Sequence, residues 1–132
     1  MKPTKSTLLY ATVGITIAII FGAFGAHYLK TKLTPDLLES FKTGVQYQLY
    51  MCIGLLAISN LKISASKGVL TAIKCVKLGT ILFAGSIYLL TLKNLSPTMS
   101  FLSIAGPITP IGGVLLIVGW FKIAFHIFKL KE

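Results

Sequence analysis

Four long apolar stretches, separated by short segments that carry nearly all of the charge, dominate this 132-residue sequence. The first covers residues 7–29, which would form a helix of about 35 Å at ~1.5 Å per residue and cross a hydrocarbon core of roughly 30 Å. The others cover residues 45–61, 69–92 and 110–128. Only 12% of the residues are charged, against roughly 25% in soluble domains. We therefore expect one all-α membrane domain over residues 1–132, a bundle of four transmembrane helices.

The distribution of lysines predicts the orientation of this bundle. With four spans, the termini and the middle connection share one side, which holds nine lysines: Lys2, Lys5, Lys62, Lys67, Lys74, Lys77, Lys122, Lys129 and Lys131. The other side holds four: Lys30, Lys32, Lys42 and Lys93. Because positive residues favour the cytoplasmic side, we expect both termini inside, with Trp120 as an interfacial anchor. Lysines at helix ends are typical of topology rather than of a nucleic-acid-binding face, so the expected partner is the lipid bilayer and not nucleic acid.

Prolines mark the segments between the apolar stretches. Thr34-Pro35 is a capping pattern, and we expect a short surface helix after it. Residues 96–108 are apolar but contain two prolines, and we expect them to dip into the outer interface without spanning it. The fourth helix is then expected to begin at Pro110, with Thr109 as its N-cap.

Small residues recur at every fourth position along the first apolar stretch. They are Gly14, Ala18, Gly22 and Ala26, and they share one helix face because residues four apart are neighbours. Such a ridge lets two membrane helices approach closely. We predict that it packs against another helix, and the sequence leaves open whether this is the second helix, the fourth helix or another chain.

A candidate site emerges from four short segments in which polar and small residues gather. These segments end the first and third helices and begin the second and fourth, so the expected topology puts all of them in the outer half of the bilayer. The candidate residues are His27, Gln46, Tyr47, Gln48, Tyr50, Ser86, Tyr88, Thr109, Gly112 and Gly113. Two interpretations stay open: a structural node that locks four helices through amides and small residues, and a ligand site. His27 likewise has two, a titratable group near membrane depth and a cap for the carbonyls that end its helix.

The groups that catalysis or metal binding requires are absent from the apolar stretches. The acids Asp36, Glu39 and Glu132 fall in a loop or a tail. Cys52 and Cys75 lack metal-ligand spacing, and we interpret them as small packing residues that form no disulfide. We therefore expect no cofactor, no bound metal, no catalytic residues and no enzymatic activity.

The same short segments carry a family resemblance. GAFGAH at 22–27, YQLY at 47–50, FAGSIY at 83–88, TPIGG at 109–113 and GW at 119–120 resemble, in order and spacing, the bacterial family catalogued as domain of unknown function 423. The resemblance implies a small four-helix protein of the bacterial cytoplasmic (inner) membrane and no established activity. One position departs from it: this chain has Met51 where many members have His, which argues against chemistry by paired histidines here.

These observations favour a structural or accessory membrane protein that packs with itself or with a larger membrane complex. The alternative is a channel or carrier for a small solute that uses the outer polar cluster, with His27 as its titrating group. A classical proton-coupled carrier would need an acid within the span, and the sequence has none there.

Overall fold

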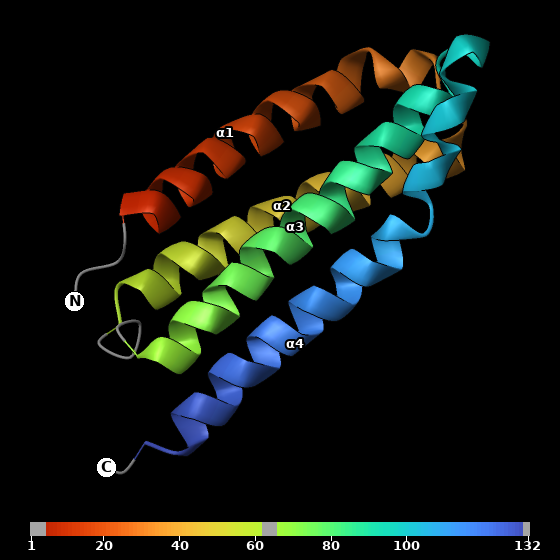
Figure 1. Cartoon of the computed structure of the whole chain (residues 1–132). Coiled ribbons are helices and arrows are strands. Elements are labelled where there is room, and N and C mark those ends of the chain that lie inside the picture. Colours follow the sequence, from red (N-terminus) through yellow and green to blue (C-terminus); the bar gives the residue numbers. More distant parts are fainter. Residues whose placement is uncertain (1–4, 62–65, 131–132) are drawn as a thin grey trace.

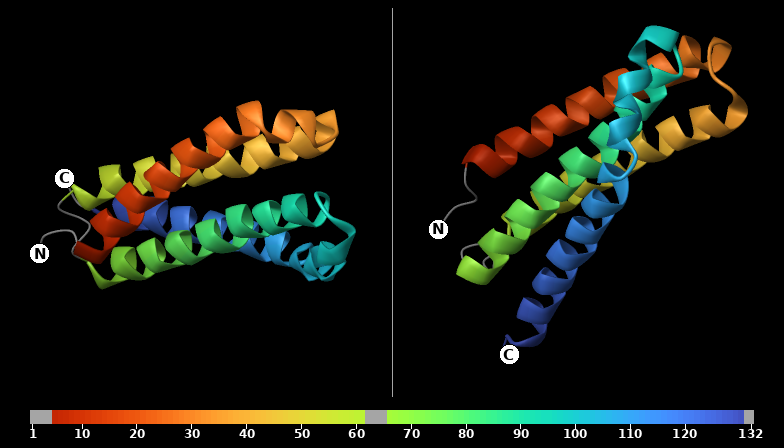
Figure 2. Two further views of the ribbon diagram at one scale, coloured as in Figure 1. Left: turned by 90° about the horizontal axis from the view of Figure 1, so that it is seen from above. Right: turned by 45° about the vertical axis from the view of Figure 1, so that its right-hand side comes forward.

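The computed structural model describes residues 5–61 and 66–130, and within them it contains helices and no strands (Figure 1). The long helices are α1 (Lys5–His27), α2 (Pro35–Ser59), α3 (Lys67–Lys93) and α4 (Ile108–Phe128). The starts of α1 and α3 and the ends of α2 and α4 lie at one end of the bundle, so consecutive helices alternate in direction (Figures 1 and 2). The prediction of an all-α bundle of four helices is confirmed. Lys2, Lys62, Lys131 and Glu132 lie outside the described residues.

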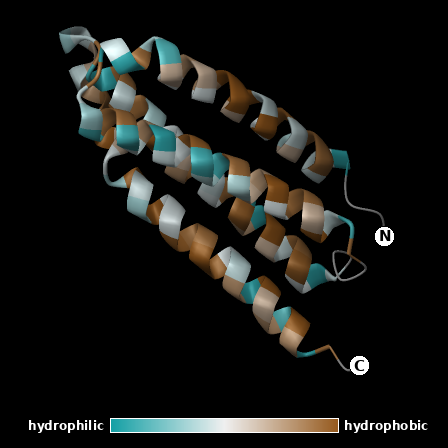
Figure 3. Ribbon diagram, turned by 180° about the vertical axis from the view of Figure 1, so that it is seen from behind, coloured by the Kyte–Doolittle hydropathy of each residue, from teal (hydrophilic) through white to brown (hydrophobic). Residues whose placement is uncertain are grey.

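Three segments are long and apolar enough to cross a membrane: Lys5–Thr31, Lys67–Lys93 and Pro97–Phe128. α2 is not among them, because Lys42 and the two amides Gln46 and Gln48 lower its mean hydropathy. It nevertheless packs against both α1 and α3. Hydrophobic colours prevail along α1 and α4, and hydrophilic colours are most frequent at the end of the bundle opposite the termini (Figure 3). α2 is therefore the most polar of the four helices that the sequence predicted as spans.

Two helices begin earlier than predicted. α2 starts at Pro35, with Thr34 as its N-cap, so the expected surface helix is the first part of α2 and the predicted start at residue 45 is wrong. α4 starts at Ile108 rather than Pro110, because a proline is tolerated anywhere in a first helical turn. Thr109 thus lies inside the helix and does not cap it.

The connections between α1 and α2 and between α3 and α4 contain short 3₁₀ helices. η1 (Leu29–Thr31) follows α1 directly, and its Leu29 is buried. η3 (Pro97–Ala105) packs against α3 and is kinked at Met99, which has non-helical backbone angles. The apolar segment at 96–108 is thus an ordered cap on the bundle, and its prolines end α3 and precede α4.

Glycines bring α3 and α4 together until their backbones touch. A Cβ atom on Gly112 would overlap the backbone of Phe83, and one on Gly79 would lie 2.9 Å from the backbone nitrogen of Leu116. On Gly119, it would lie 3.1 Å from the backbone oxygen of Ala72. Such close contact maximises dispersion between helices that have no hydrophobic drive to associate in lipid. The sequence pattern identified Gly112 but missed Gly79 and Gly119.

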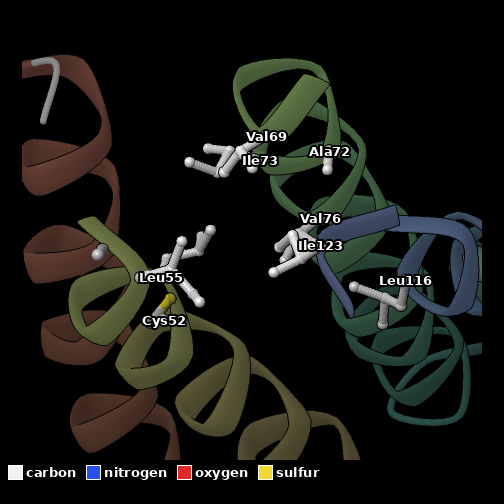
Figure 4. Close-up of a cluster of buried hydrophobic side chains, with 10 residues drawn as sticks. Cys52, Leu55, Val69, Ala72, Ile73, Val76, Leu116 and Ile123 are labelled. Atoms are coloured by element: carbon white, nitrogen blue, oxygen red, sulfur yellow. The ribbon is translucent and has the colours of Figure 1, made fainter. Parts of the chain in front are cut away.

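The hydrophobic core lies in the half of the bundle nearer the termini, and all four long helices contribute to it (Figure 4). Leu55 of α2 and Val69 and Val76 of α3 are fully buried there. Trp120 of α4 packs against this core and its indole ring lies 2.6 Å from the position of a Cβ on Gly54. The ring of Trp120 thus fills the space over a glycine of α2, and its role as an interfacial anchor stays a prediction.

We expect Gly112→Ala to lower the free energy of unfolding by about 1–3 kcal/mol, because the added methyl group must push α4 away from the backbone of α3. Gly85→Ala is the matched control, since a Cβ there has nothing within 4 Å. Unfolding of the purified variants in detergent micelles, followed by circular dichroism, measures both. Equal stability of the two variants would contradict the close contact.

Candidate functional site

Gln48 is the centre of the polar residues inside the bundle. This residue is only 8% exposed, although its side chain is polar and its surroundings are largely apolar. Its Nε2 donates to the backbone oxygen of Gly14 at 2.7 Å, and its Oε1 accepts from the Tyr88 hydroxyl at 2.9 Å. One amide therefore connects α1, α2 and α3. Because unpaired polar groups are costly in lipid, these bonds satisfy Gln48 and fix the positions of the three helices relative to one another.

Aromatic rings cover this bridge on the side away from the termini. The Tyr88 ring meets Phe21 edge-on, with centroids 4.7 Å apart, and lies 5.4 Å from the ring of Phe41. Phe41 is buried and fills the space above Gly25, where a Cβ would lie 2.9 Å from its ring. The two rings pack against the phenol of Tyr88 and leave its hydroxyl directed at Gln48.

A second polar contact joins α3 to α4. The Ser86 hydroxyl is 2.7 Å from the Thr109 hydroxyl and also donates to the backbone oxygen of Phe83 at 2.9 Å. The ring of Phe83 is also in ordinary contact with the Cβ position on Gly113. Ser86, Thr109, Gly112 and Gly113 therefore form a helix–helix junction in which the polar side chains are paired.

Of the remaining candidate residues, Tyr47 alone reaches one of these contacts. His27 ends α1 and is exposed, and Gln46 is exposed as well. Tyr47 and Tyr50 are 42% and 56% exposed and their rings are 6.3 Å apart, and the Tyr47 ring also lies 5.1 Å from the ring of Phe83 on α3. The sequence placed both Gln46 and Gln48 in one polar cluster, but residues two apart point to different sides of a helix, and only Gln48 is buried. The single outer cluster predicted from the sequence is thus divided between two internal junctions and the surface.

The small-residue ridge of α1 packs against α2, which answers the question that the sequence left open. A Cβ on Gly14 would lie 2.5 Å from Cys52 Sγ, and one on Gly22 would lie 3.7 Å from a methyl carbon of Val45. Ala18 is buried, but Ala26 is exposed and Gly25 takes its place. The prediction for Ala26 is wrong because residues every four apart drift around a helix of 3.6 residues per turn.

Two contributors to the interior were missed by the sequence analysis. Phe41 begins a series of buried residues on α2 at steps of three or four residues, a spacing that indicates a packed helix face; the series is Phe41, Gly44, Gln48, Cys52 and Leu55. Met51 is the other, because the indole N–H of Trp120 donates to its sulfur at 2.9 Å. Position 51 lies ten residues along α2 from Phe41, or about 15 Å, and is therefore distant from the end of α1 that carries His27.

An elongated groove of about 620 Å³ runs between α1 and α3. Its rims are apolar side chains of the two helices, and its floor contains Gln48 and Cys52 of α2. Among the described residues, no three His, Cys, Asp or Glu side chains lie close enough to hold a metal ion. The polar groups of the interior pair with each other or with backbone oxygens, so their evident role is to hold helices together.

Comparison with known proteins places the chain in a family. Residues 21–113 match the family described as "Protein of unknown function (DUF423)". The UPF0382 membrane protein YwdK of Bacillus subtilis is 36% identical over 121 residues, which cover 90% of this chain and 93% of the relative. A UPF0382 membrane protein of Haemophilus influenzae is 32% identical over 132 residues, covering 100% and 99% of the two chains. No solved structure matches the chain significantly.

The chain therefore belongs to this family, as the resemblance of its short motifs implied. Its relatives are named as membrane proteins, and its helices are apolar on their outer surfaces. It is an integral membrane protein, and neither the family nor the relatives are named for an activity.

We expect Gln48→Leu to lower the free energy of unfolding by about 1–3 kcal/mol, because it leaves the Tyr88 hydroxyl without its acceptor in a buried place. Gln46→Leu, the same change at an exposed position two residues away, should leave stability unchanged. A double-mutant cycle of Gln48→Leu with Tyr88→Phe should give a coupling of about 0.6 kcal/mol, the average for hydrogen bonds between membrane helices, and at most about 1.7 kcal/mol. Additive effects would show that the two side chains do not interact.

Proposed function

We propose that this family member is a non-catalytic structural or accessory component of the bacterial cytoplasmic membrane. In this proposal it packs against copies of itself or against a larger membrane complex. The observation that supports it most is the internal use of its polar side chains: Gln48 is bonded to α1 and α3, and Ser86 to α4. A protein that binds or moves a polar solute needs polar groups directed at that solute, and these are directed at other helices.

The outer surfaces of α1 and α4 are suited to contact with another membrane protein. α1 packs chiefly on α2, and α4 chiefly on α3, so the two helices form opposite edges of the bundle. Ile20 of α1 is 58% exposed, and Ile117 and Phe121 of α4 are each 71% exposed. In a bilayer, lipid or the apolar surface of a neighbouring protein covers such side chains.

Transport and catalysis have less support. Of the residues assigned to a carrier site, His27 and Gln46 are on the surface, and the interior ones, such as Gln48 and Ser86, are bonded to other helices. The two acids within the described residues, Asp36 and Glu39, lie near the start of α2, where they are exposed. A carrier or an enzyme would have to act without an acid inside the bundle, which disfavours proton coupling and acid–base catalysis.

We further propose that both ends of the chain are cytoplasmic. The end of the bundle where α1 and α3 begin carries six of the described lysines: Lys5, Lys67, Lys74, Lys77, Lys122 and Lys129. The opposite end carries four, together with Asp36 and Glu39. An excess of lysine on one side favours retention of that side in the cytoplasm.

Cysteine labelling tests the orientation. In a background with Cys52→Ala and Cys75→Ala, we expect Lys30→Cys to react with a membrane-impermeant maleimide in intact cells lacking an outer membrane barrier. Lys129→Cys should react only after permeabilisation, because it lies at the other end of the bundle. The background without a new cysteine is the control, and the reverse pattern would refute the proposed orientation.

Site-specific photocrosslinking tests the accessory role. A benzophenone amino acid at Ile20 or Ile117 of the full chain, expressed at its native level, should give a discrete cross-linked protein band, either a dimer or a larger partner. The same group at Leu116, which is only 6% exposed, is the matched control and should give no intermolecular band. Monomer alone from both outer positions, with no membrane complex lost on deletion of the gene, would contradict the proposal.

A further inference from the structure

The groove between α1 and α3 has a positively charged end. Lys77 of α3 directs its ammonium group to the Ser6 hydroxyl at 3.2 Å, and the group lies 5.3 Å from the centre of the Tyr10 ring. The Tyr10 hydroxyl in turn donates to the backbone oxygen of Lys77 at 2.9 Å. Ser6 lies in the first turn of α1, so the long lysine stem carries its charge toward the edge of the membrane, as expected for a snorkelling side chain.

No carboxylate of the described residues neutralises this lysine. Asp36 and Glu39 are near the start of α2, at the opposite end of the bundle. Lys74 lies one turn before Lys77 on α3, on the same side of the helix, and adds a second positive charge. The partners that the structure gives Lys77 are a neutral hydroxyl and an aromatic ring. The charge at this end of the groove is therefore available to an anion.

The other end of the groove is closed by the rings of Phe21 and Tyr88, 4.7 Å apart. From Lys77 to Tyr88 is eleven residues of α3, or about 16 Å at ~1.5 Å per residue. One leaflet of the hydrocarbon core measures about 15 Å, half of ~30 Å. Along α1 the lining of the groove is longer, about 22 Å, so the groove runs from the membrane edge to somewhat beyond the middle of the bilayer, where the two rings end it.

The width of the groove identifies the kind of chain that fits it. Its lining extends along α1 from Ser6 to Phe21, about 22 Å. With a volume of about 620 Å³, its mean width is about 6 Å. Carbon atoms touch at roughly 3.5–4.0 Å, so one methylene chain fits, whereas a helix of ~10–12 Å diameter does not. Figure 2 shows α1 crossing obliquely over the other helices.

Gly85 lies on the wall of the groove, and its surroundings differ from those of the glycines at the helix contacts. A Cβ on Gly85 would have nothing within 4 Å, whereas a Cβ on Gly79 of the same helix would meet the backbone of α4. Gly85 is eight residues from Lys77, about 12 Å, and so borders the path that a chain from the membrane edge would follow.

We propose that this groove binds one anionic phospholipid. The phosphate lies at Lys77 and Ser6, and one acyl chain follows the groove past Gly85 to the ring pair Phe21 and Tyr88. In the proposed orientation this is the cytoplasmic leaflet, whose anionic lipids attract lysines at the membrane edge. The site is independent of the accessory role, since a protein that has no protein partner can hold this lipid equally well.

Native mass spectrometry of the purified full chain in detergent tests this site. The probes are dioleoylphosphatidylglycerol, dioleoylphosphatidylcholine with the same acyl chains, and inorganic phosphate. We expect one phosphatidylglycerol to bind per chain and to be retained in preference to phosphatidylcholine. Phosphate alone should neither bind detectably nor displace the lipid, because most of the contact is with the acyl chain.

Two substitutions separate the parts of the site. Gly85→Leu should abolish the single bound lipid by filling the groove, and Ala23→Leu, on an exposed part of α1 outside the groove, is the control. Lys77→Gln should weaken phosphatidylglycerol about fivefold, the equivalent of ~1 kcal/mol for one lysine at a membrane surface, and leave phosphatidylcholine unchanged. Lys93→Gln, at the other end of the same helix, is its control.

Several results would overturn the proposal. They are equal retention of the two phospholipids, binding of phosphate alone at the affinity of the lipid, a bound lipid that survives Gly85→Leu, and equal effects of Lys77→Gln and Lys93→Gln. Circular dichroism establishes that each variant is folded. Should Gly85→Leu fail to fold, the lipid preference of the wild type and its loss in Lys77→Gln decide the question.

Discussion

The structure depends on a requirement that lipid imposes on Gln48: an amide within the bilayer must find partners in the protein. Gln48 meets it with one bond to the backbone of α1 and one to Tyr88 of α3. Either bond is lost if a helix moves along its neighbour by one turn. The bridge therefore sets the register of three helices, a task that apolar side chains perform poorly in a bilayer, because lipid tails are as apolar as they are.

The fourth helix is positioned by shape instead. Gly79 and Gly112 let the backbones of α3 and α4 touch, and the Ser86–Thr109 contact adds one polar pair. On the other side of the bundle, Gly14 gives Cys52 room in the same way. The molecule thus consists of two closely packed pairs, α1 with α2 and α3 with α4, joined by the core of α2 and α3 and by one bridging amide.

Much of this arrangement follows from the sequence, and the failures have a common physical cause. Apolar stretches of the right length predicted four helices, and small residues predicted close contact on α1. Local patterns could not decide between Gln46 and Gln48, since both are amides, two residues apart in a helix that is apolar on several sides. The choice depends on which residue faces Gly14 and Tyr88, and those lie 34 and 40 positions away in the chain. The prediction for Ala26 failed similarly, because the sequence does not specify the rotation of the helix that carries it.

The same forces explain why a groove exists between α1 and α3. α1 follows α2 through its small residues, and it meets α3 through Tyr10 at Lys77 and through Phe21 at Tyr88. Between those two contacts the helices are held apart by the oblique course of α1, and Gly85 adds no side chain to fill the gap. An empty space there would forfeit the dispersion contacts of its walls. In a bilayer the nearest material of the right width is an acyl chain, so the packing that joins α1 to α2 also creates a place that only hydrocarbon fills well.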